Sequence, residues 1–155
     1  MIRNLASIVI VSVLCICVAV IFNYKYAIMI NATGSLGNWA FLVKKGVIPQ
    51  EKGEYIAFIP PKNPYYTKTF VKIIGGVAGD EVRHEERVFY VGDTKIGKAK
   101  EVSLKGEPLD IGPVGVIPED HYFVYTQMKD SYDSKYKTIG WIPKDLVVGT
   151  AYPIL

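Results

Sequence analysis

The chain has 155 residues, half of them hydrophobic and 21% charged, and its mean hydropathy is positive. This length allows one compact domain, and the composition excludes collagen-like, low-complexity and disordered chains. The net charge is only +3, from 18 Lys and Arg against 15 Asp and Glu, and the basic residues are scattered. We therefore expect no nucleic-acid partner.

The apolar residues are concentrated in Leu5–Phe22, a run without a charged side chain. As an α-helix this run would extend about 27 Å, close to the hydrocarbon thickness of a lipid bilayer. A Tyr-Lys-Tyr triplet at 24–26 follows it and suits the headgroup region. A cleaved signal peptide is the alternative, but no small-x-small cleavage site follows the run. We predict a membrane anchor over residues 1–22 and a second domain over residues 23–155.

The remaining sequence is typical of short β-strands rich in Val, Ile, Tyr and Phe and separated by Gly and Pro. Val91–Thr94 has the pattern of a hairpin tip, and Leu104–Pro118 that of a surface loop. We found no amphipathic helix of useful length, so we predict one membrane-tethered, mostly β domain. The predicted strands are Ala27–Ile30, Tyr55–Ile59, Phe70–Ile74, Val88–Val91, Tyr122–Thr126 and Val147–Tyr152.

Lys72 stands in the middle of an apolar predicted strand, Phe70–Ile74. Because side chains alternate between the faces of a strand, both faces here are apolar, and the lysine occupies a position that suits Val. One interpretation is an edge strand whose lysine reaches water through its long stem. The other is a desolvated lysine, whose pKa would fall from about 10.4 to about 7–8 and make it a usable general base.

A lysine base needs a nucleophile, and the turn at Asn31–Gly37 offers Ser35 among small residues. Small neighbours leave room for a substrate carbonyl, although a serine in such a turn usually has only a structural role. His84, in a charged segment predicted as a loop, and His121, at the start of a strand, are both expected at the surface. Metal-ligand spacing and a phosphate-binding loop are lacking, so no metal or cofactor is expected.

Three motifs occur along the chain in this order: TGSL at Thr33–Leu36, FVKIIGGVAGD at Phe70–Asp80 and SYDSKY at Ser131–Tyr136. They resemble the nucleophile box, the lysine box and the Ser-x-Asp-Ser-Arg-Tyr box of the signal peptidase I superfamily (S26 serine peptidases). The tail, with WIP at Trp141–Pro143 and VGTAYPI at Val148–Ile154, resembles the closing box. The Asn-x-Thr-x-Ser spacing before the nucleophile is closest to the TraF-type peptidases of conjugative transfer and pilin processing.

The resemblance implies a signal-peptidase-like coiled β-sheet domain behind one transmembrane helix, and a serine endopeptidase with a Ser/Lys dyad. Ser35 would be the nucleophile and Lys72 the base that deprotonates it. The backbone N–H of Ser35 and the hydroxyl of Thr33 would form the oxyanion hole. Ser131 would hold the Lys72 amine, and Asp133 would support that segment.

The implied substrate is the signal or leader peptide of an exported pre-protein, and the TraF-type spacing narrows it to a pro-pilin or a conjugative-transfer component. The implied location is the bacterial inner membrane, crossed once, with the catalytic domain on the periplasmic face. Two departures, Gly37 in place of a family Pro and Lys135 in place of an Arg, favour a specialised branch.

Two other functions fit parts of the sequence. The first is a non-catalytic, membrane-tethered β module of an envelope or pilus assembly, which the presence of both Ser35 and Lys72 disfavours. The second is a self-cleaving Ser/Lys regulator of the repressor type, which would be cytoplasmic and is disfavoured by Leu5–Phe22.

Overall fold

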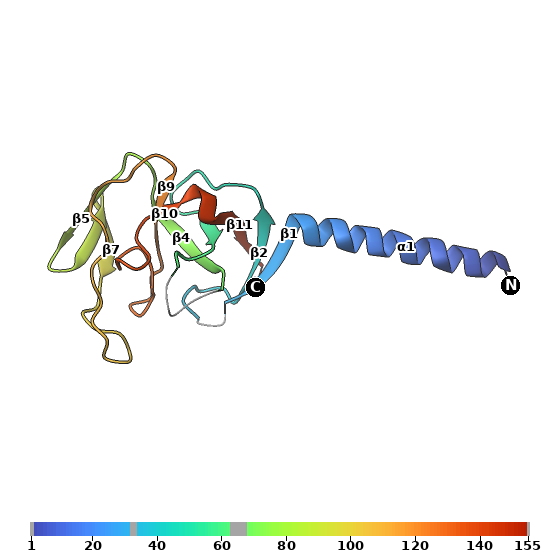
Figure 1. The fold of residues 1–155 in the computed structure, drawn as a ribbon, viewed down its shortest axis with the longest axis horizontal. Helices are drawn as coiled ribbons and strands as arrows, with labels where there is room; N and C mark the ends of the chain where they lie inside the picture. Colours follow the sequence, from blue (N-terminus) through green and yellow to red (C-terminus); the bar gives the residue numbers. More distant parts are fainter. Residues whose placement is uncertain (1, 32–33, 63–67, 155) are drawn as a thin grey trace.

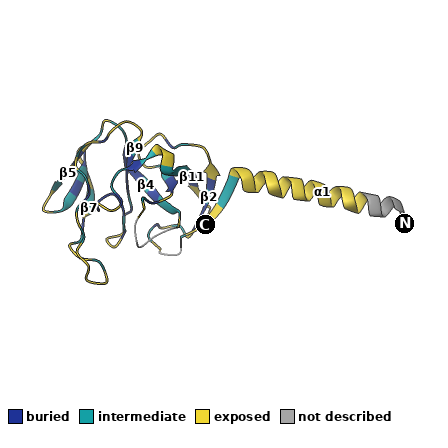
Figure 2. Ribbon diagram, viewed as in Figure 1, coloured by how far each residue is buried: buried dark blue, intermediate teal, exposed yellow. Residues whose placement is uncertain are grey.

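In the computed structural model, which describes residues 2–31, 34–62 and 68–154, one long helix projects from a β domain (Figure 1). This helix, α1 (Ile2–Lys25), includes a segment, Ser7–Lys25, that is long and apolar enough to cross a membrane. Every side chain described between Ser7 and Tyr24 is exposed (Figure 2). Because exposed apolar surface costs free energy in water, this segment is suited to a lipid environment.

The larger of two antiparallel sheets has seven strands and carries the predicted site. Its spatial order is β1-β2-β11-β3-β4-β9-β10, so the last long strand of the chain lies between two early ones. A 3-10 helix, η1 (Lys144–Leu146), precedes β11. The strands are β1 (Tyr26–Ile30), β2 (Ala40–Lys45), β3 (Tyr55–Phe58), β4 (Phe70–Gly76), β9 (His121–Tyr125), β10 (Ile142–Pro143) and β11 (Val147–Pro153).

The smaller sheet lies at the end of the domain away from α1 (Figure 1). It has the order β7-β6-β5-β8, and its strands are β5 (Glu81–Glu85), β6 (Val88–Val91), β7 (Thr94–Lys98) and β8 (Gly115–Val116). The two sheets meet at the end of β4, where a Cβ on Gly76 would lie 2.7 Å from Ile117 Cδ1. A larger residue would have to displace the end of the Ile117 side chain and would also press on Val91, so a glycine suits this position.

Buried apolar side chains form three clusters. The first lies on the face of the large sheet that includes Ile56, Ile74 and Val124. The second joins the two sheets around Phe89 and Phe123. The third lies on the other face of the large sheet, around Phe41, Val43 and Ala57. β4 contributes side chains to both faces, because it is an interior strand.

The structure confirms the mostly β prediction, and each of the six predicted strands is present to within two residues. The predicted hairpin tip at Val91–Thr94 is also present, since Val91 of β6 pairs with Thr94 of β7. The strands that were not predicted are β2, β5, β7, β8 and β10, and α1 continues three residues beyond the predicted end of the anchor. The segment predicted as a surface loop, Leu104–Pro118, contains the short strand β8.

The prediction that His84 lies in a loop is wrong. His84 lies in β5 opposite Phe89 of β6, and the two ring centroids are 5.4 Å apart. Because side chains alternate along a strand, His84 shares its face with the buried Val82, and the charges of Arg83 and Glu85 point the other way. The strand was not predicted because most of its residues are charged and only one, Val82, is apolar.

Candidate active site

The side chain of Lys72 is buried at the centre of the large sheet. Its strand, β4, lies between β3 and β9, and Lys72 pairs with Ile56 and is only 5% exposed. The edge-strand interpretation of this lysine is therefore wrong. The Nζ atom donates a hydrogen bond to Ser131 Oγ over 2.9 Å and lies 5.4 Å from the centroid of the Phe70 ring.

Burial lowers the pKa of Lys72 from 10.5 to about 8, because desolvation penalises the ammonium form. The negative charge of Asp133 opposes this shift, and the positive charge of Lys135 adds to it. Near pH 8, a substantial fraction of the Lys72 amines is therefore neutral. A neutral amine with a lone pair can accept a proton, which an ordinary solvated lysine cannot do at this pH.

The segment that contains Ser131 is fixed to β9 by several bonds. Ser134 Oγ accepts from the Val124 N–H over 2.9 Å, and the Ser134 N–H donates to the Val124 carbonyl over 3.0 Å. β9 in turn pairs with β4, the strand of Lys72. The sheet thus brings together Lys72 and Ser131, which are 59 residues apart in the chain.

The same segment contains a buried ion pair. Lys135 Nζ is 2.8 Å from Asp133 Oδ2, and both side chains are almost completely buried. The carboxylate of Asp133 also accepts from two backbone N–H groups, those of Lys135 over 3.2 Å and Thr126 over 3.4 Å. The lysine that replaces the family Arg therefore still reaches the carboxylate, through one contact of its ammonium.

Ser35 lies in the loop between β1 and β2 and is half-buried. The next residue, Leu36, is buried in the third cluster, which also includes Val71 and Ile73. These two residues flank Lys72 in β4, so the Ser35 loop and the lysine strand are joined by one cluster. Thr33, predicted to contribute to the oxyanion hole, lies outside the described residues.

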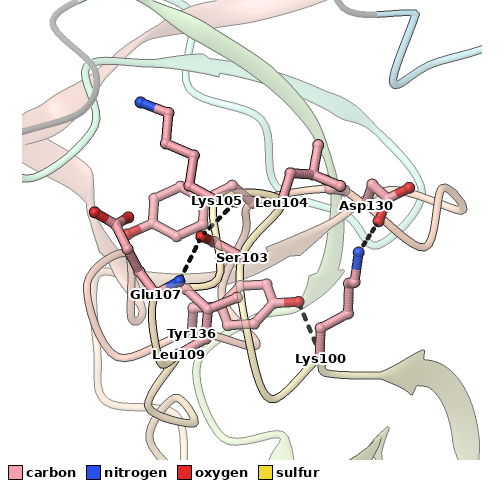
Figure 3. A pocket seen from close by; sticks show the side chains of 10 residues that line it. Lys100, Ser103, Leu104, Lys105, Glu107, Leu109, Asp130 and Tyr136 are labelled. Atoms are coloured by element: carbon pink, nitrogen blue, oxygen red, sulfur yellow. Dashed lines mark hydrogen bonds and ion pairs between the residues drawn. The ribbon is translucent and has the colours of Figure 1, made fainter.

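A cavity of about 440 Å³ has Ser131 among its lining residues. Leu109, Tyr136 and the ion pair between Lys100 and Asp130 also line it (Figure 3). Within residues 2–31, 34–62 and 68–154, no group of three or more His, Cys, Asp or Glu side chains could hold a metal ion.

Comparison with known proteins identifies the family. A model of the family described as "Signal peptidase, peptidase S26" matches residues 1–155, the whole chain. The chain belongs to the S26 signal peptidase family. The predicted recognition of signal peptidase I relatives is thereby confirmed at the level of the family. No curated protein matches the chain.

Among solved structures, a signal peptidase I from Enterococcus faecalis V583 resembles the chain with a TM-score of 0.46 and 21% sequence identity. The match covers 68% of this chain and 98% of the other. As an S26 signal peptidase, the chain is a serine endopeptidase, a hydrolase of peptide bonds in pre-proteins, as predicted. Sequence reasoning assigned no role to Asn31, although it is the first residue of the Asn-x-Thr-x-Ser spacing.

Proposed function

We propose that this S26 peptidase cleaves with a Ser/Lys dyad, in which Ser35 is the nucleophile and Lys72 is the general base. The observation that carries this assignment is the burial of Lys72, which lowers its pKa to about 8 while Ser131 Oγ accepts one of its N–H groups. Histidine is then not needed, because the neutral amine can accept the serine proton.

In the proposed reaction, Ser35 Oγ attacks the carbonyl carbon of the scissile bond while its proton passes to Lys72 Nζ. The backbone N–H of Ser35 and the hydroxyl of Thr33 would donate to the oxyanion that forms. The Lys72 ammonium then protonates the departing amine, which leaves an acyl-enzyme ester on Ser35. Water, deprotonated by the again neutral Lys72, hydrolyses this ester and restores the serine. Ser131 and Asp133 act as positioning residues for Lys72.

We also propose that residues 1–22 anchor the chain in the bacterial inner membrane and that residues 23–155, the peptidase domain, lie on its periplasmic face. The exposure of α1 supports an anchor. A second support is an apolar face on the sheet edge next to α1, because Ile28, Ile30, Tyr152 and Ile154 are exposed there. β1 follows α1 without a linker, so this face and the anchor can share one bilayer surface.

The proposed substrate is the signal or leader peptide of an exported pre-protein, and more narrowly a pro-pilin or a conjugative-transfer component. The family supports the broader class. The Asn-x-Thr-x-Ser spacing at Asn31–Ser35 supports the narrower one, because it resembles the TraF-type branch.

This function predicts cleavage close to the membrane surface, after a small side chain. α1 ends at Lys25, ten residues before Ser35, and an extended chain of that length spans at most about 36 Å. The full-length protein in liposomes should therefore cut a pre-protein within a few residues of its apolar leader segment, as read by mass spectrometry of the product termini. A substrate series of pro-pilins and unrelated pre-proteins tests the narrower class. Cuts deep in a folded domain, or after large charged residues, would contradict the proposal.

A further inference from the structure

Asn31 makes an unusual set of contacts across the Ser35 loop. Its Nδ2 atom donates to the carbonyl of Leu36 over 2.9 Å and to the carbonyl of Asn38 over 3.0 Å. Its backbone N–H donates to the carbonyl of Trp39 over 2.8 Å, which closes the loop. Both N–H groups of one planar amide are thus used to hold the chain on the far side of Ser35.

The same amide also faces the predicted nucleophile. Ser35 Oγ lies 3.4 Å from Asn31 Oδ1, a long hydrogen bond in which the hydroxyl donates. The acceptor and the two donors of Asn31 are in one rigid plane, so the positions of the Leu36 and Asn38 carbonyls and the direction of the Ser35 hydroxyl depend on the same side chain.

Two glycines, Gly34 and Gly37, lie on either side of the serine in this loop. Gly34 has a φ of +62°, and a Cβ at Gly34 or Gly37 would meet nothing within 4 Å. Glycines on both sides of a residue increase the number of backbone conformations available to it. Leu36, buried in the third cluster, fixes the backbone after Ser35, but it does not fix the hydroxyl. The hydrogen bond to Asn31 Oδ1 acts on the hydroxyl directly.

We propose that Asn31 is a positioning residue, which orients Ser35 Oγ for attack by holding the loop carbonyls with its amide. This inference rests on the proposed role of Ser35 as nucleophile. Because nucleophile orientation affects the chemical step more than substrate binding, loss of Asn31 should lower kcat and leave KM nearly unchanged.

The test compares Asn31→Ala, Asn31→Asp and the control Gln50→Ala in the full-length protein, with a leader-peptide reporter that contains a small-x-small site. Asn31→Ala should lower kcat by about 30- to 100-fold, with KM within about threefold of the wild-type value. Asn31→Asp keeps the acceptor and the shape but cannot donate to two carbonyls when ionised, so its kcat should fall similarly. Gln50→Ala removes a comparable amide-to-carbonyl bond, 3.0 Å to Ile48, from an exposed loop and should retain wild-type kinetics.

Two further measurements separate positioning from general instability. The pH at which kcat/KM rises should not change in Asn31→Ala, because this substitution alters no charge near Lys72. Hydrogen exchange of the backbone at 34–39 should become faster in both Asn31 variants while the β-strands remain protected. If Asn31→Ala does not fold, the kcat and the hydrogen exchange of Asn31→Asp test the proposal.

Wild-type kcat in Asn31→Asp, or a loss confined to KM, would overturn the proposal. Cleavage of the reporter by the wild-type protein is required for the proposed function. A wild-type protein that fails to cleave would count against that function, whereas unchanged exchange at 34–39 in the Asn31 variants would count against the role of Asn31 alone.

Discussion

Ser35→Ala and Lys72→Met should each lower kcat/KM by at least about 1,000-fold, because the nucleophile and its base act as a unit. The double variant should be no worse than either single variant by more than a small factor. Lys72→Arg should be equally inactive, since a guanidinium does not release its proton at working pH. Leader-peptide cleavage by the full-length protein in detergent measures each effect.

Matched controls for these variants are Ser103→Ala and Lys52→Met. Ser103 caps a surface turn by accepting from the backbone N–H groups of Lys105 and Glu107, and Lys52 forms an exposed ion pair with Asp80. Both controls should retain activity near the wild-type value. Substantial cleavage by Ser35→Ala or Lys72→Met would contradict the assignment of Ser35 and Lys72 as the catalytic dyad.

Asp133→Asn should lower the free energy of unfolding by about 3–5 kcal/mol, because it leaves the buried Lys135 ammonium without its partner. It should also move the activity profile. The charge of Asp133 raises the pKa of Lys72, so its removal lowers that pKa further and the rise in kcat/KM should occur at lower pH. Urea unfolding and the pH dependence of kcat/KM test the two effects.

The control for Asp133→Asn is Glu85→Gln, which makes the same chemical change in an exposed pair with Arg83. Exposed pairs contribute little to stability, so this variant should unfold like the wild-type protein. An Asp133→Asn variant as stable as the wild-type protein would contradict the stabilising role of the buried pair. A pH profile moved upward would contradict the effect of the Asp133 charge on the pKa of Lys72.

Among the strands predicted from sequence, β4 and β9 have continuous apolar residues, because both faces of the sheet are covered there. β2, which begins Ala-Phe-Leu-Val, was missed in spite of such a run. β5 and β7 were missed because their charged residues occupy the solvent face and leave few apolar positions, as in EVRHE. β5 and β7 each pair with β6. This pairing between strands cannot be predicted from the pattern of either strand alone.

The residues proposed for the candidate site follow from sequence motifs, but the geometry around Lys72 does not. The apolar neighbours of Lys72 indicated an unusual lysine, yet they fitted an edge strand equally well. The choice depends on the position of β4 between β3 and β9, which long-range pairing determines. The contact with Ser131 likewise depends on the bonds of Ser134 to β9. The hydrogen bonds of Asn31 could not be predicted, because their acceptors are backbone carbonyls, which every residue has.

The dependence of kcat/KM on pH tests the central claim most directly, because it reports the ionisation of the essential base in the free enzyme. Lys72 must be neutral to accept the Ser35 proton, so kcat/KM of the full-length protein should be low at acidic pH and rise with an apparent pKa near 8. A rise only near pH 10.5, the value of a solvated lysine, would contradict the account and show that the base is not a buried Lys72.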